Sequence, residues 1–225
     1  MSVAELSSSA QNYLKVIWGL QEWSSEPVTV TRIAEKTGWR VSTVSGAVTK
    51  LADQGLVHRA PYGDVTLSAT GRGHALMMVR RHRLMETFLV AVLGYGWDQV
   101  HDEAERLEHA VSDFMVERID ELLGHPTRDP HGDPIPSPGG EVHQPGAVLL
   151  AATGPGDQVT VERISDADPD LLRFFGDRGI VVGARLSIVA APPYSDSLHV
   201  KVEDFDDVPL GRVATHAVWV SVPPS

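Results

Sequence analysis

The chain has 225 residues, enough for two or three small domains, of which 42% are hydrophobic and 22% charged. No apolar run reaches the roughly 18 residues of a membrane span, and the N-terminus lacks the basic and apolar regions of a signal peptide, so we expect a soluble, cytoplasmic protein without membrane contact. The absence of cysteine excludes disulfides and thiolate metal ligands.

The charge is unevenly distributed along the chain. A net charge of −11 at first argues against DNA binding. However, residues 1–83 hold ten Lys or Arg against six Asp or Glu, whereas residues 84–225 hold nine against 24. A basic N-terminal part followed by an acidic body fits a DNA-binding segment joined to a cation-binding one.

The first 67 residues predict three helices and a hairpin. We expect an amphipathic helix over residues 8–23, a second helix from an N-cap at Thr29 to Gly38, and a third over residues 41–54. Two short strands then flank a Pro/Gly turn between residues 56 and 67. Helix, turn, helix and hairpin together are typical of a DNA-binding winged helix, and a generic helical domain with a hairpin is the alternative.

The third helix opens with one arginine followed by small hydroxyl residues. Such side chains suit contacts with phosphates and thymine methyl groups better than a dense code of base contacts. Specificity would then depend partly on DNA shape. The candidate DNA-contacting residues are Thr29, Arg40, Ser42, Thr43, Ser45, Gly46, Lys50, Arg59 and Tyr62.

Further helices are expected downstream of the hairpin. A long helix over residues 69–93, beginning near Thr70, is nearly all apolar in its second half, which favours an oligomer interface as well as core. Two shorter helices are expected, from about Trp97 to His109 and over residues 114–123.

Two of these helices carry candidate metal ligands, in the patterns His82-x3-Glu86 and His101-x3-Glu105-x2-Glu108-His109. At about 100° per residue, the four side chains of the second pattern fall within an arc of about 100° on one helix face. Nitrogen and carboxylate ligands suit Mn(II), Fe(II), Co(II) or Zn(II). The alternative for both patterns is a solvated row of surface charges.

The remainder of the chain predicts a loop and a β domain. Residues 124–147 hold six prolines and five glycines and are expected to form a linker or irregular loop, with His125 and His131 as ordinary loop histidines. Short strands are expected at 148–152, 158–164, 185–190, 198–202 and 216–220, which suggests a small β-barrel. A short helix at 171–176 follows Asp166, Asp168 and Asp170.

At this point the sequence resembles the diphtheria-toxin-repressor family of iron- or manganese-dependent regulators. The resemblance rests on Tyr13–Trp18, Arg80–Glu86, His101–His109 and the loop Asp129–Pro136. It implies a winged-helix DNA-binding domain over residues 1–74, a helical metal-binding and dimerisation domain over 75–140, and an SH3-like (FeoA-like) barrel over 141–225. It also implies a homodimeric repressor that binds a palindromic operator in double-stranded DNA when metal is bound.

The resemblance further implies two metal sites. The first is formed by Asn12, Glu105, Glu108 and His109. The second is formed by His82, Glu86 and His101, aided by a group from the C-terminal domain, for which Asp168 or Asp170 is the candidate.

The identity of two ligands separates the subfamilies. Manganese-type members have Glu where this chain has Glu105, and Asn12 matches neither subfamily's choice. We therefore expect a Mn(II)-activated repressor of metal-uptake genes. The alternatives are an Fe(II)-dependent regulator of the same family, a di-metal carboxylate enzyme, and a winged-helix regulator of an organic ligand.

Overall fold

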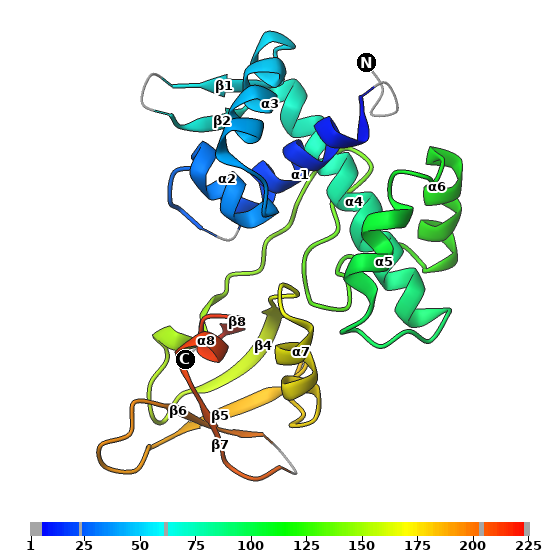
Figure 1. Ribbon diagram of the computed structural model, residues 1–225. Helices are drawn as coiled ribbons and strands as arrows, with labels where there is room; N and C mark the ends of the chain where they lie inside the picture. Colours follow the sequence, from blue (N-terminus) through cyan, green and yellow to red (C-terminus); the bar gives the residue numbers. More distant parts are fainter. Residues whose placement is uncertain (1–5, 23, 61–62, 203–204, 223–225) are drawn as a thin grey trace. The chain divides into compact units, whose positions relative to one another are not determined.

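The computed structural model describes residues 6–22, 24–60, 63–202 and 205–222, and the chain divides into two compact units (Figure 1). The first unit comprises Met1–His82 with Pro136–Glu141, and the second comprises Arg83–Ile135 with Val142–Ser225. The long helix α4, Ala69–Ala91, begins in the first unit and ends in the second. No helix of the described residues is long and apolar enough to cross a membrane.

Three helices and a hairpin form the first unit. The helices contact one another and bury branched apolar side chains such as Leu14, Ile33 and Val48, and the hairpin lies beside the third helix (Figure 1). The elements are α1 (Ser8–Glu22), α2 (Val30–Thr37), α3 (Val41–Asp53), β1 (Val57–Arg59) and β2 (Val65–Leu67).

Local capping signals set the bounds of the second helix. The hydroxyl of Thr29 accepts a hydrogen bond from the backbone N–H of Arg32 at 3.2 Å, which starts α2. Gly38 ends the helix in the left-handed conformation, with φ of 70°. The third helix begins three residues later, and β1 and β2 pair as an antiparallel hairpin. The predicted winged helix-turn-helix is therefore confirmed.

Helix α4 starts against the base of this hairpin. The Ser68 hydroxyl accepts from the N–H of Gly71 at 3.0 Å and donates to the carbonyl of Gly55 at 2.7 Å. A Cβ atom at residue 71 would clash with the backbone carbonyl of Leu56. Glycine is therefore needed where the helix passes this close to another backbone segment.

Two short helices pack with the second half of α4 in the second unit. They are α5 (Val100–Leu107) and α6 (Asp113–Leu122), and the core that they share with α4 includes Leu84, Leu89 and Ile119. Residues 97–99 form a turn, so α5 begins later than expected, and Glu108 caps its C-terminus with helical dihedral angles and an N–H bond to Ala104 O at 2.9 Å. The regular helix therefore begins three residues later and ends two residues earlier than expected.

The rest of the second unit is a six-stranded antiparallel sheet of order β3-β8-β4-β5-β6-β7 (Figure 1). Its core includes Ile164, Phe175 and Val218. The elements are β3 (Val148–Leu149), the 3₁₀ turn η2 (Leu150–Ala152), β4 (Gln158–Ile164), α7 (Pro169–Gly176), β5 (Arg185–Val189), β6 (Leu198–Val202), β7 (Val208–Leu210), α8 (Arg212–Thr215) and β8 (Val218–Ser221).

This sheet differs from the expected barrel in three respects. Among the described residues no pairing joins β3 to β7, so the sheet is open. Strand β7 was not expected, because it has three residues with Pro209 in the middle, and proline is tolerated only on an edge strand. Residues 150–152 and 212–215, expected to be strand or loop, form short helical turns instead.

The middle of the segment expected to be a linker is buried. Residues 131–136 are all buried, and Ile164 N donates to His131 O at 2.8 Å. Gly132 has φ of 88°, and a Cβ there would clash with the backbone carbonyl of Glu162. Within the second unit this loop is therefore fixed against β4, as an irregular but ordered connection.

Candidate metal centre

Three side chains from different elements of the second unit converge on one point. Glu86 lies on α4 and is 1% exposed, His101 lies on the first turn of α5, and Asp166 lies between β4 and α7. His101 Nδ1 is 3.4 Å from Glu86 Oε1 and 2.8 Å from Asp166 Oδ2. Two carboxylates and an imidazole at these distances form a ligand set that suits a divalent first-row ion.

Two loop residues adjoin this set from the side of the packed loop. His131 and Asp129 are both buried, and with Glu86 they form a second group whose potential ligand atoms lie within 4.8 Å of one another. His131 Nε2 is 2.8 Å from the carbonyl oxygen of Trp97, and its Nδ1 is 3.8 Å from Glu86 Oε2. The loop therefore brings a second imidazole to the same buried carboxylate.

The carboxylates of this cluster concentrate negative charge around its two histidines. Burial alone would lower the pKa of His101, but the carboxylates of Asp166 and Glu86 outweigh it and raise that pKa to about 10. Burial would also lower the pKa of His131, but the carboxylate of Glu86 outweighs this effect and raises that pKa to about 10. Burial and the charge of Glu86 raise the pKa of Asp129 to about 7. Without metal, protonated imidazoles balance these carboxylates, and a bound cation can replace the protons.

A second set of ligand types lies at the C-terminal end of α5. The Glu108 side chain is fully buried, and His109 Nε2 is 3.5 Å from Glu108 Oε1. Potential ligand atoms of Glu105 and Glu108 lie within 4.8 Å of each other. Glu108 therefore lies close to both Glu105 and His109, although the regular helix ends at residue 107.

Two further residues with an expected metal role belong to the first unit. His82 is buried, and its Nδ1 lies 3.4 Å from Lys15 Nζ. On α1, the amide oxygen of Asn12 is buried and has no hydrogen-bond partner among the described residues. A buried oxygen without a donor is unfavourable, and a cation would satisfy it, so Asn12 fits a ligand role.

The candidates Asp168 and Asp170 are placed elsewhere. Asp168 caps α7 and accepts from the N–H groups of Asp170 and Leu171 at 2.9 and 3.2 Å. Asp170 pairs with Arg173 on the exposed side of the same helix. Of the three acidic residues in this segment, the structure brings Asp166 to His101.

Most of the candidate DNA-contacting residues are exposed on the first unit. Arg40, Ser42, Thr43, Gly46 and Lys50 are exposed along α3, and Ser45 is half-buried. Arg59 is exposed at the end of β1, whereas the hydroxyl of Thr29 is engaged in capping α2. Tyr62 lies outside the described residues.

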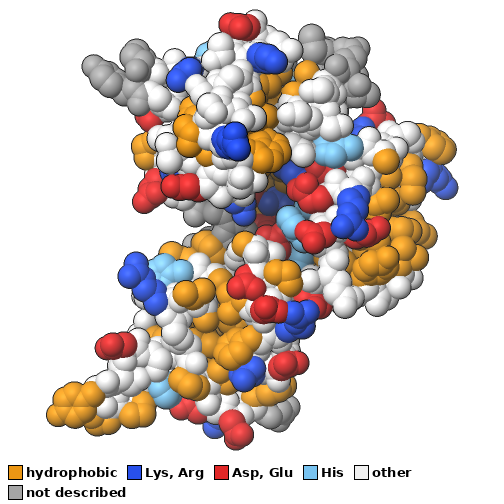
Figure 2. Space-filling model, viewed as in Figure 1, with side chains coloured by type: hydrophobic (Ala, Val, Ile, Leu, Met, Phe, Trp, Pro, Cys, Tyr) orange, Lys and Arg blue, Asp and Glu red, His pale blue; other side chains and the backbone are white. Residues whose placement is uncertain are grey.

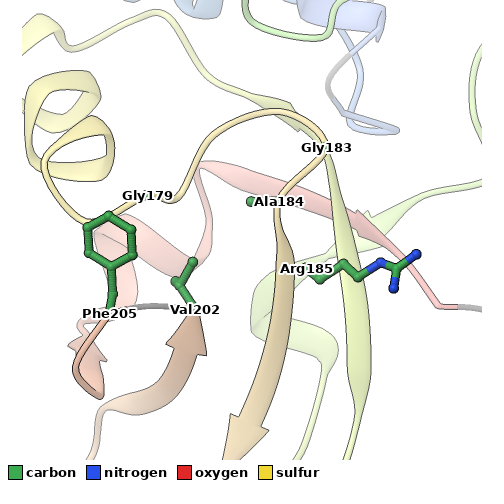
Figure 3. Close-up of a pocket in the computed structure, with 6 residues that line it drawn as sticks. All are labelled: Gly179, Gly183, Ala184, Arg185, Val202 and Phe205. Atoms are coloured by element: carbon green, nitrogen blue, oxygen red, sulfur yellow. The ribbon is translucent and has the colours of Figure 1, made fainter.

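A hollow on the β domain is separate from these ligand clusters. It is bordered by the start of β5 and the end of β6 (Figure 3). The described residues that line it are Gly179, Gly183, Ala184, Arg185, Val202 and Phe205, and none of these six carries an imidazole or a carboxylate.

Three family models match consecutive parts of the chain. Residues 5–65 match the N-terminal DNA-binding domain of iron-dependent repressors, and residues 68–137 match the metal-binding and dimerisation domain of the same repressors. Residues 148–222 match the FeoA domain.

Individual proteins that resemble the chain are also metal-dependent repressors by name or transcriptional repressors of the same group. The chain is 33% identical to the iron-dependent repressor IdeR of Mycobacterium tuberculosis over 96% of this chain and 98% of the relative. It is 32% identical to the diphtheria toxin repressor of Corynebacterium diphtheriae, covering 82% of this chain and 86% of the relative. Among solved structures, a manganese-dependent transcriptional repressor in complex with manganese matches with a TM-score of 0.90 and 52% identity, over 95% of this chain and 99% of that one. These proteins are transcriptional repressors and not enzymes, which excludes the di-metal enzyme alternative.

Proposed function

The chain belongs to the diphtheria-toxin-repressor family and is a metal-dependent transcriptional repressor; on that premise we propose that Mn(II) is its activating ion and metal-uptake genes are its targets. The observation that carries the proposal is the donor chemistry. Every ligand candidate is an oxygen or an imidazole nitrogen, and the buried carboxylate of Glu108 has Glu105 one turn before it. Hard oxygen donors favour Mn(II), with Fe(II) next.

We propose that Glu105, Glu108 and His109 hold the activating ion, and the family resemblance adds Asn12 to that set. We assign a second ion to Glu86, His101 and Asp166, with His82, one helical turn before Glu86, as a further ligand. The metal would supply positive charge that balances these carboxylates. Glu86 and Glu108 are buried and placed before an ion binds, which limits the entropy lost on binding.

Activation would then be a population shift. We propose that metal binding favours a dimer in which two α3 helices meet successive major grooves of a palindromic operator, about 34 Å apart. We propose that the repressor is cytoplasmic, in the same compartment as the DNA that it binds. The size of the shift is limited by how much more tightly the metal binds this DNA-binding arrangement than the arrangement that does not fit the operator.

An exposed apolar surface on the second unit supports the homodimer. Hydrophobic side chains gather over its helical part (Figure 2). The exposed hydrophobic residues of this part of the chain include Phe114 and Leu122 on α6 and Leu93 just after α4, which are 72%, 65% and 55% exposed. Large exposed apolar surfaces are typical of protein interfaces. This agrees with the expected interface role of the apolar end of α4.

The choice between Mn(II) and Fe(II) is testable on DNA. A palindromic site is first selected from random duplexes in the presence of Mn(II), and binding is then titrated against Mn(II), Fe(II), Co(II) and Zn(II), with anaerobic samples for Fe(II). We expect half-maximal binding at a free Mn(II) concentration within the cellular range. Activation by Fe(II) at a tenfold lower free concentration than by Mn(II) would instead make the protein an iron regulator.

A further inference from the structure

A lysine on α1 contacts a histidine on α4 within the first unit. Lys15 is half-buried, His82 is buried, and Lys15 Nζ lies 3.4 Å from His82 Nδ1. An ammonium donates hydrogen bonds and cannot accept them, so Nδ1 accepts this bond through its lone pair. In the metal-free protein, His82 is therefore the neutral tautomer that carries its proton on Nε2.

This contact and metal binding by His82 exclude each other, whichever ring nitrogen binds the ion. An ion at Nδ1 needs the lone pair that now accepts from Lys15, and the ammonium would repel it. An ion at Nε2 replaces the proton there, so the ring carries its proton on Nδ1, which can then no longer accept from Lys15. In both cases the ammonium must leave His82.

We propose that Lys15 is an internal competitor for the metal ion at His82 and thereby raises the metal concentration at which the protein responds. The inference rests on the proposed role of His82 as a metal ligand. A lysine carries a compact positive charge at the end of a flexible stem. The side chain can therefore hold the imidazole in the metal-free protein and move away when a divalent ion binds.

The neighbouring turn of α1 carries a group with the opposite effect on a cation. Asn12 and Lys15 are three residues apart on this helix, so their side chains share one face. The amide oxygen of Asn12 is buried and has no hydrogen-bond partner among the described residues, so the ammonium does not donate to it. The oxygen of Asn12 would attract a cation, whereas the ammonium of Lys15 would repel it.

The competing interpretation is a purely structural contact, in which Lys15 only holds α1 against α4. The two interpretations predict opposite changes in metal affinity. Removal of a structural contact would loosen the two helices and would weaken metal binding or leave it unchanged. Removal of a competitor would tighten metal binding.

Titration of the full-length protein with Mn(II) decides between them. Lys15→Met removes the ammonium and keeps most of the apolar stem, and we expect the dissociation constant to fall at least about threefold, as for a partly screened charge. Lys15→Arg keeps the positive charge and should stay closer to the wild type. Lys36→Met is the matched control for the loss of one positive charge, because Lys36 is exposed at the end of α2. Affinity in Lys15→Met that is equal to or weaker than in Lys36→Met would overturn the inference.

A double-mutant cycle tests whether the effect passes through His82. In a His82→Ala background, Lys15→Met should change Mn(II) affinity less than about twofold. The full gain in that background would refute competition at His82.

Nitrogen-15 NMR of the histidine-labelled protein with excess chelator reads the contact itself. We expect Nδ1 of His82 to be unprotonated and Nε2 protonated, and we expect the Nδ1 resonance to shift in Lys15→Met. A protonated Nδ1 in the wild type would contradict the contact and the inference with it. If the wild-type protein bound no Mn(II) in the titration, the proposed function would fail instead, so the two failures are distinguishable.

Discussion

Asp166→Asn is the sharpest perturbation of the centre, because it removes one charge and keeps the shape of the side chain. In the metal-free protein, Asp166 Oδ2 lies 2.8 Å from His101 Nδ1 and helps to hold that imidazole in its protonated form. In the metal-bound protein we expect the same oxygen to contact the ion. The substitution therefore has separate effects on stability and on metal affinity.

The stability effect in the metal-free protein should be modest. A hydrogen bond to a charged group contributes about 1.5–3 kcal/mol. The side chains of His101 and Asp166 are 42% and 24% exposed, so solvent screens the pair, and we expect a loss of about 1 kcal/mol. Urea denaturation in the presence of chelator measures it.

The pH dependence of that loss has a defined sign. The pKa of His101 is raised to about 10 in the folded protein, from 6.5, so its protonation stabilises the fold fully below pH 6.5 and progressively less toward pH 10. The pKa of Asp166 is held below its usual range by His101, against the effect of burial, so the same pair is also lost in strong acid. Asp166→Asn should thus be most destabilising between about pH 5 and 6.5 and nearly neutral near pH 10. Destabilisation that grows as the pH rises would refute this assignment.

The metal effect should be larger. Loss of a hydrogen-bonded partner of a metal ligand typically lowers affinity about 10–100-fold, and loss of a direct carboxylate ligand should do at least as much. Isothermal titration with Mn(II) measures it, with Asp168→Asn as control, because Asn caps α7 as well as Asp does. The reasoning fails if Asp166→Asn leaves affinity within about twofold while Asp168→Asn lowers it.

Three further predictions follow from the same geometry. Glu108→Ala should abolish Mn(II)-dependent operator binding, whereas His82→Ala should only weaken it. Fluorescence anisotropy measures the binding, on variants that circular dichroism shows to be folded, and a larger loss with His82→Ala would mean that the roles of the two metal sites are exchanged. If the Asn12 oxygen binds the ion, Asn12→Asp should tighten Mn(II) binding and Asn12→Ala should weaken it in isothermal titration, whereas changes under about threefold, or roughly 0.65 kcal/mol, would remove it from the site. Gly132→Ala should lower the free energy of unfolding by at least about 2 kcal/mol in urea, because alanine disfavours this φ and its Cβ meets backbone, and equal stability to Gly146→Ala, where a Cβ has open space, would contradict that.

Periodicity and capping residues were enough to predict the helical part of the fold. Thr29 and Gly38 set the bounds of α2, and the spacing of the ligands on α5 predicted that Glu105 and Glu108 lie together. The bounds of a helix and the spacing of side chains along it depend on residues that are close together in the sequence. The domain boundaries at residues 74 and 140 remain predictions.

Long-range contacts account for what was missed. Asp166, Asp168 and Asp170 look equivalent in sequence, and only the helix start at Pro169 directs Asp168 into capping while Asp166 reaches α5. His131 was expected to be an ordinary loop histidine, because the six prolines of its segment suggest a linker. What orders this loop is its contact with β4, more than 25 residues later in the chain, which no local pattern reveals.

The central claim is that metal binding controls DNA binding. Its most direct test measures the affinity of one protein sample for a selected palindromic operator, first with excess chelator and then with saturating Mn(II). We predict that Mn(II) raises specific affinity at least tenfold, about 1.4 kcal/mol of coupling, while affinity for unrelated DNA stays weak. Equal operator affinity under the two conditions would contradict the account.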